Sequence, residues 1–146
     1  MDFSYLYLST EGRIGRKMWW IGHIILAAIV IVISLIVNAL FGPLSIMTRL
    51  INLILILALA FPAYAVSAKR FQDRDKNGVL AAILIGISIF SSLLQLFGLT
   101  GSPIAPNALG MILGLATLVI GIWYLIELGI LRGTIGDNQY GPDPVG

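Results

Sequence analysis

Reactive side chains are concentrated in one short segment, Lys69-Arg70-Phe71-Gln72-Asp73-Arg74-Asp75. On a helix Arg70, Asp73 and Arg74 would share a face, since residues three and four positions apart are neighbours. The two guanidiniums would repel each other, Asp73 would offset part of that repulsion, and a further anion would offset the rest. That anion could be a lipid phosphate, a soluble ligand or a carboxylate of this chain. The acidic candidates within the chain are Asp137, Asp143 and Glu127.

Three interpretations of this cluster stay open. It is a solvated set of charges that fixes membrane topology and tethers the C-terminal tail, or a binding site for a lipid headgroup or other anion, or a catalytic site. No catalytic residue is assigned. The candidate anion-binding residues combine arginine and lysine charges with polar groups that would fix their geometry, and they are Arg13, Arg16, Lys69, Arg70, Asp73, Arg74, Asn138, Tyr140 and Asp143.

Two ionisable residues lie inside otherwise apolar segments. His23 follows Lys17 by six residues and Glu127 precedes Arg132 by five, which places both about 8 to 9 Å below the membrane surface at 1.5 Å per residue. An ionisable group within a membrane indicates function by default. The two could form a proton-linked pair, or Glu127 could pair with Lys69 or Arg70 while His23 hydrogen-bonds within the bundle.

Composition excludes several kinds of site. The chain has one histidine and no cysteine, so disulfides, thiolate catalysis and multi-histidine or cysteine metal sites are excluded, and no metal or cofactor is predicted. The sequence pI is near 9.2, but the basic residues flank apolar segments. Membrane topology explains that arrangement better than nucleic-acid binding does, and no nucleic-acid partner is predicted.

The elements that must position these residues are apolar helices. Only 11% of the residues are charged, against about 25% in soluble domains. Uncharged apolar runs of about 20 residues match the thickness of a bilayer core. The prediction is an all-α, polytopic protein, a single membrane domain over residues 1–146. It comprises an interfacial lead (1–17), four transmembrane helices at about 18–41, 45–67, 79–97 and 108–131, and a tail (133–146).

Glycine and proline residues predict where the helices end or bend, and the basic residues predict the orientation in the membrane. Gly42-Pro43 ends the first helix, Pro62 should kink the second, and residues 98–107 form a turn-rich loop. Eight of the nine Lys and Arg residues lie in the lead, the segment between helices two and three, or the tail, and only Arg49 lies on the other side. The positive-inside rule therefore predicts that both termini are cytoplasmic.

Three segments together resemble a known family. They are Gly12-Arg13-Ile14-Gly15-Arg16 with Trp19 and Trp20, the segment from Lys69 to Gly78, and Gly133-Thr134-x-Gly136-x-Asn138-x-Tyr140-Gly141-Pro142-Asp143-Pro144. Their order and spacing are similar to those of the bacterial inner-membrane, YhaH-like family "domain of unknown function 805". This chain has Phe71 and Gln72 where the family commonly has Leu and His, and Val79 where it often has Trp. The resemblance implies a bacterial plasma-membrane protein without an assigned activity.

Three functional hypotheses follow. The leading one is a non-enzymatic multi-pass plasma-membrane protein that binds an anionic lipid headgroup, a small anion or a protein partner at its cytoplasmic face. The first alternative is a small oligomeric transporter or channel, with a polar path from His23 and Glu127 through Asn38, Asn52, Ser88 or Gln95. The second alternative is a membrane enzyme acting on lipid, with Asp73 or Asp143 as a base. The expected partners are membrane lipid and either a protein partner or further copies of the chain.

Overall fold

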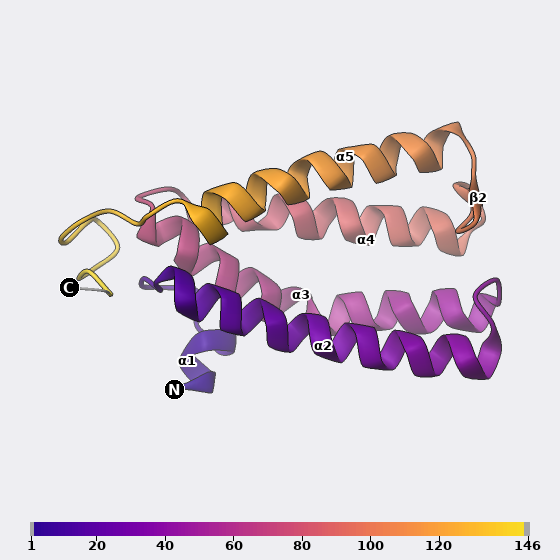
Figure 1. The fold of residues 1–146 in the computed structure, drawn as a ribbon, viewed down its shortest axis with the longest axis horizontal. Coiled ribbons are helices and arrows are strands. Elements are labelled where there is room, and N and C mark those ends of the chain that lie inside the picture. Colours follow the sequence, from indigo (N-terminus) through magenta and orange to yellow (C-terminus); the bar gives the residue numbers. More distant parts are fainter. Residues whose placement is uncertain (1, 145–146) are drawn as a thin grey trace.

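The computed structural model describes residues 2–144, and its long helices form two hairpins that lie side by side (Figure 1). A short helix, α1 (Phe3–Leu8), precedes them. The first hairpin consists of α2 (Arg16–Phe41) and α3 (Ile46–Asp73). The second consists of a 3-10 turn, η1 (Gly78–Ala81), with α4 (Ala82–Leu96), and then α5 (Ala108–Tyr124), which continues into a π-helical segment, η2 (Leu125–Ile130).

The turn of the first hairpin follows from its sequence. Gly42 ends α2 with φ of +80°, a left-handed conformation that favours glycine. Ser45 then caps α3, because its side chain accepts a hydrogen bond from the amide of Met47 at 3.2 Å. The first predicted helix, 18–41, therefore ends where expected and begins two residues early.

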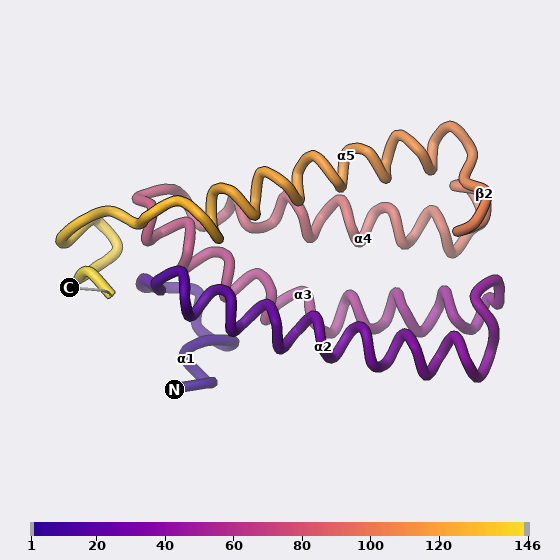
Figure 2. The backbone as a smooth tube through the Cα atoms, in the orientation of Figure 1, coloured from indigo at the N-terminus to yellow at the C-terminus, as the bar shows by residue number. Residues whose placement is uncertain are grey.

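The second predicted helix, 45–67, was wrong at its C-terminal end, because α3 continues to Asp73. The helix extends into the polar segment because the side chains of Lys69 and Arg70 are fully buried and hydrogen-bonded there. The tube in Figure 2 shows α3 changing direction along its length. Pro62 lies inside this helix, and proline is a usual cause of such a bend because it lacks an amide proton.

Asparagine side chains start both helices of the second hairpin. The Oδ1 atom of Asn77 accepts from the amide of Val79 at 2.9 Å, and that of Asn107 accepts from the amide of Gly110 at 3.0 Å. Between α4 and α5, the predicted loop contains a two-stranded ribbon of β1 (Gly101–Ser102) and β2 (Ala105–Pro106). The third and fourth helices agree with the predicted 79–97 and 108–131 to within a residue or so.

Among residues 2–144, four helices are long and apolar enough to cross a membrane, the same number as the sequence predicts. Both chain ends lie at the same end of the bundle as the α3–η1 turn (Figure 1), and we call this the basic end. Only 6% to 28% of the most apolar window of each span is buried within the chain. The remaining apolar surface therefore needs an apolar environment around it.

The buried core lies toward the basic end. Leu6 of α1 is fully buried, as are Val66 and Phe71 of α3 and Leu128 of η2. The lead thus packs onto α3 rather than remaining separate from the bundle. This packing brings the lead, the end of α3 and the tail together.

Candidate functional site

Asp73 is the centre of a buried polar cluster at the basic end. Its side chain is 2% exposed, and its two oxygens accept hydrogen bonds from different arginines. Oδ1 lies 3.1 Å from Nε of Arg13, and Oδ2 pairs with Nη1 of Arg70. One carboxylate therefore joins the lead to α3, in a setting where charge pairs are strong because water is excluded.

Arg70 is fully buried and also holds the end of the last helix. Its Nε donates to the carbonyl of Leu128 at 2.8 Å and its Nη2 donates to the carbonyl of Leu131 at 2.5 Å. Carbonyls at the end of a helix have no intrahelical partner and need external donors. Arg70 supplies them, so α3 and η2 are fixed to each other.

Arg13 performs the same role for the tail. Its Nη1 donates to the carbonyls of Gly136 at 2.7 Å and Gly141 at 3.0 Å, and its Nη2 donates to the carbonyl of Thr134 at 2.7 Å. The amide of Thr134 in turn donates to the carbonyl of Asp73 at 2.8 Å. The tail is therefore an ordered, folded-back segment, as its turn residues predict.

Lys69 holds the lead without any carboxylate. It is fully buried, and its Nζ donates to the carbonyls of Tyr5, Leu6 and Ser9, at 2.9 Å for Leu6. Nζ also lies 4.7 Å from the ring centre of Tyr5, a cation–π contact. Partial burial raises the pKa of Tyr5. We call Arg13, Lys69, Arg70, Asp73 and the carbonyls that they bind the clasp.

Two glycines of the sequence motifs are explained by the clasp. A Cβ atom at Gly133 would overlap the carboxylate of Asp73, so only glycine allows the tail to approach this closely. Gly12 has φ of +98°, and a Cβ there would collide with the hydroxyl of Tyr5. The three motifs that resemble the family pattern thus meet at Asp73.

Glu127 pairs with different cations from those predicted. We expected Lys69 or Arg70, but Oε1 lies 2.9 Å from Nε of Arg74 and 2.7 Å from Nζ of Lys76. That prediction was wrong because Lys69 already donates to backbone carbonyls, and all three nitrogens of Arg70 are engaged by two carbonyls and Asp73. Arg74 also donates to the carbonyl of Arg132 at 2.5 Å.

The other candidate residues have more local roles. Asn138 donates from Nδ2 to the carbonyl of Gln72 at 2.9 Å, and Asp143 accepts from the amide of Gly136 at 3.0 Å. Tyr140 donates from its backbone amide to Oδ1 of Asn138 at 2.9 Å. Sequence reasoning missed Gln72 as a linker, although its Nε2 donates to the carbonyl of Thr10 at 3.0 Å.

His23 hydrogen-bonds within the bundle, as the simpler of the two hypotheses expected. Its Nδ1 lies 3.1 Å from the carbonyl of Trp19, and its Nε2 lies 3.3 Å from Oγ of Ser67. A carbonyl only accepts, so Nδ1 carries a proton and neutral His23 accepts from Ser67 through Nε2. No ionic contact joins His23 to Glu127 in the part of the chain described by the structure.

A small pocket opens beside the clasp, with a volume of about 120 Å³. We call it the arginine pocket. Three guanidiniums and two carboxylates contribute to its walls, which consist of Arg16, Arg70, Asp73, Arg132, Gly133, Thr134 and Asp143. Arg16 is held in place by a hydrogen bond from Nη1 to the carbonyl of Ile130 at 2.9 Å. The pocket has an excess of one positive charge.

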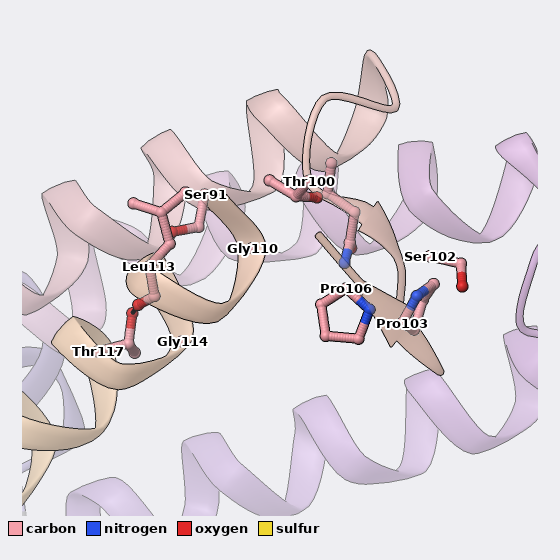
Figure 3. Close-up of a pocket in the computed structure, with 10 residues that line it drawn as sticks. Ser91, Thr100, Ser102, Pro103, Pro106, Gly110, Leu113, Gly114 and Thr117 are labelled. Atoms are coloured by element: carbon pink, nitrogen blue, oxygen red, sulfur yellow. Dashed lines mark hydrogen bonds between the residues drawn. The ribbon is translucent and has the colours of Figure 1, made fainter. Parts of the chain in front are cut away.

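Two larger cavities lie among the spans. One, of about 390 Å³, lies between the two hairpins and is mostly apolar. The other, of about 380 Å³, lies between α4, α5 and the β1–β2 loop (Figure 3). We call these the inter-hairpin cavity and the loop pocket. Ser91 and Thr100 line the loop pocket, and within residues 2–144 their buried hydroxyls have no hydrogen-bond partner.

Across residues 2–144 no three histidine, aspartate or glutamate side chains lie close enough together to hold a metal ion. The charged groups of the basic end are instead arranged to bind backbone carbonyls and one another.

Comparison with known proteins identifies the family of the chain. It is 32% identical to the uncharacterised protein YiiR of Escherichia coli K12 over 147 aligned positions, which cover 98% of this chain and 90% of the relative. The same values hold for YiiR of Escherichia coli O157:H7. No solved structure matches the chain. A model of a family described as proteins of unknown function matches residues 7–142, so all three motifs lie almost entirely within the match, and the chain belongs to that family, DUF805.

Proposed function

We propose that the chain is a multi-pass protein of the bacterial plasma membrane whose basic end faces the cytoplasm and binds an anionic lipid headgroup in the arginine pocket. The observation that carries this proposal is the convergence of Arg16, Arg70 and Arg132 from three separate segments on one small pocket. Guanidinium groups suit phosphate because their donors match its geometry.

The allocation of charge identifies which arginines are available to a ligand. Arg13 and Arg70 are paired with Asp73, and Arg74 is paired with Glu127. Within residues 2–144, Arg16 and Arg132 have no ion-pair partner, and both are exposed. These two residues therefore supply the charge that an external anion would meet.

The size of the pocket restricts the ligand. Its volume of about 120 Å³ equals that of about four water molecules in the liquid. A phosphate group fits this space, whereas a whole lipid does not. Asp73 and Asp143 on the walls oppose an anion, so the pocket favours one singly charged phosphodiester over a strongly charged cluster of phosphates.

The headgroup proposal predicts a specific loss of binding. Replacing both Arg16 and Arg132 by glutamine should weaken binding of short-chain phosphatidylglycerol to the purified protein in detergent by about 30-fold, at about 1 kcal/mol for each basic residue. Titration calorimetry would measure this, with Lys17→Gln plus Arg49→Gln as the charge-matched control. Equal affinities in the two double variants would refute the proposal. Competition by inorganic phosphate would show whether the free anion suffices.

The proposed orientation has a separate test. Because eight of nine basic residues lie at the basic end, a reporter fused after residue 146 should be active in the cytoplasm. A cysteine introduced at Ser102, in the opposite loop, should react with a membrane-impermeant maleimide in intact cells. Labelling only after lysis would reverse the orientation.

Neither alternative hypothesis gains support from the geometry. Of the polar path expected for a transporter, His23 and Ser88 line the inter-hairpin cavity and Gln95 lines the loop pocket, but Asn38 and Asn52 line none of the three cavities. The lipid enzyme required Asp73 or Asp143 as a base. Both oxygens of Asp73 already accept from guanidiniums, so neither is placed to take a proton from a substrate.

A further inference from the structure

The inter-hairpin cavity has a polar end that faces the basic end of the molecule. Trp19, His23 and Ser67 line this end, whereas the rest of the wall is mostly apolar and includes residues from all four spans, such as Leu26, Leu59 and Ile85. The two hairpins diverge away from the basic end (Figure 1). The cavity therefore lies at membrane depth, where hydrocarbon chains rather than water are the surrounding solvent.

A buried donor at the polar end has no acceptor. Trp19 is 5% exposed, and its Nε1 makes no hydrogen bond within residues 2–144. A Cβ at Gly129 would lie 3.0 Å from Cζ3 of Trp19, so the benzo edge of the indole faces η2 and the N–H edge faces away from it. Buried donors are rarely left unpaired in proteins, and each exception requires an explanation.

The neighbouring polar groups do not provide that acceptor. The carbonyl of Trp19 and the Oγ of Ser67 are hydrogen-bonded to His23, and within residues 2–144 neither accepts from the indole of Trp19. The adjacent indole, that of Trp20, is satisfied by the carbonyl of Gly129 at 3.2 Å. An ester or phosphate oxygen of a lipid would accept from Trp19, while its hydrocarbon chain would fill the apolar part of the cavity.

The cavity and the arginine pocket are neighbours on the same helix. Trp19 lines the former and Arg16 lines the latter, three residues apart and therefore on one face of α2. At the end of the last span the same pairing recurs, because Arg132 lines the arginine pocket and Leu125 lines the inter-hairpin cavity. A molecule with an anionic head and an apolar chain would occupy both spaces at once.

We infer that the inter-hairpin cavity holds an acyl chain of the same anionic phospholipid whose headgroup occupies the arginine pocket. This inference rests on the proposed function for the headgroup and adds to it the binding site of the acyl chain. The acyl chain of the lipid enters between the hairpins. The ester group of the lipid accepts from Trp19, and its phosphate lies between Arg16 and Arg132. The protein thereby selects one lipid from the bilayer.

Fluorescence of Trp19 tests whether the acyl chain lies in the inter-hairpin cavity. With Trp20→Phe and Trp123→Phe, Trp19 is the one remaining tryptophan of the three in the sequence. In nanodiscs, phosphatidylglycerol brominated on its acyl chains should quench this fluorescence at least twofold more than brominated phosphatidylcholine. Filling the cavity with Ala63→Phe should remove the difference. The matched control is Ala58→Phe, at an exposed position of α3 outside the cavity wall.

Each result decides a different part of the inference. If Ala63→Phe leaves the quenching unchanged, the acyl chain does not lie in the inter-hairpin cavity, whatever the result for the headgroup. Quenching that responds to Ala63→Phe but not to Arg16→Gln with Arg132→Gln keeps the chain in the cavity and refutes the headgroup site. If the tryptophan variants do not fold, native mass spectrometry of otherwise unaltered protein replaces fluorescence. Ala63→Phe should then retain at least threefold less phosphatidylglycerol than Ala58→Phe, and equal retention overturns the inference.

Discussion

Replacing Asp73 by asparagine should release the tail and lower the free energy of unfolding by about 3 to 5 kcal/mol, the usual cost of removing one partner of a buried ion pair. The carboxylate is 2% exposed and is the shared ion-pair partner of Arg13 and Arg70. Asparagine keeps the shape but leaves two buried guanidiniums without a counter-charge. Thermal unfolding in detergent would measure the loss of stability, and limited proteolysis within residues 133–144 would report the tail.

Asp75→Asn is the control for this change. Asp75 is exposed, two residues away, and its Oδ1 accepts a hydrogen bond from Gln139 at 3.1 Å. Its replacement should alter the free energy of unfolding by less than about 0.5 kcal/mol, as is usual for surface positions. If Asp73→Asn and Asp75→Asn unfold at the same temperature with equally protected tails, the clasp does not stabilise the molecule.

Replacing Lys69 by methionine should detach the lead, at a cost of about 3 kcal/mol or more, since hydrogen bonds to charged groups contribute about 1.5 to 3 kcal/mol each. Methionine fills similar space but donates nothing to the carbonyls of Tyr5, Leu6 and Ser9. Helix α1 has only six residues and has little stability of its own. Hydrogen exchange over residues 2–12 would measure the detachment.

Lys17→Met provides the comparison, because Lys17 is an exposed lysine at the start of α2. It should leave exchange in the lead unchanged. Protection of the lead that persists in Lys69→Met would mean that burial of Leu6 alone holds α1 against α3. Both charge-removing variants retain the apolar spans, so insertion into the membrane should continue in each.

The number of spans could be predicted because composition alone determines it. Long uncharged segments have few alternatives to crossing a bilayer. The end of α3 was harder to predict, because Lys69 and Arg70 are residues that normally stop an apolar helix. Their acceptors are the carbonyls of Leu6 and Leu128, about 60 residues away on either side. The local sequence around Lys69 and Arg70 therefore does not predict these partners.

The candidate site was predicted in part. Arg13, Arg70 and Asp73 were among the candidate residues, and the structure brings these three into contact. The sequence reasoning sought an anion for the surplus positive charge, whereas the clasp satisfies most of that charge with backbone carbonyls. Residue types do not reveal which carbonyls lack a partner. The π-helical geometry of η2, with its wider turn, also displaces Glu127 from the positions that α-helical spacing predicts.

The connections of Arg13 impose an order on how the molecule is completed. Arg13 precedes all four spans, yet three of its acceptors belong to residues 134–141, which follow the last span. During synthesis the hydrogen bonds from Arg13 to the tail must therefore wait until the fourth span has left the ribosome, whereas both arginine partners of Asp73 are made before that span. Until then Asp73 and Arg70 stand at the membrane surface without the tail that covers them. The clasp is thus complete only after the residues that follow the fourth span have joined it.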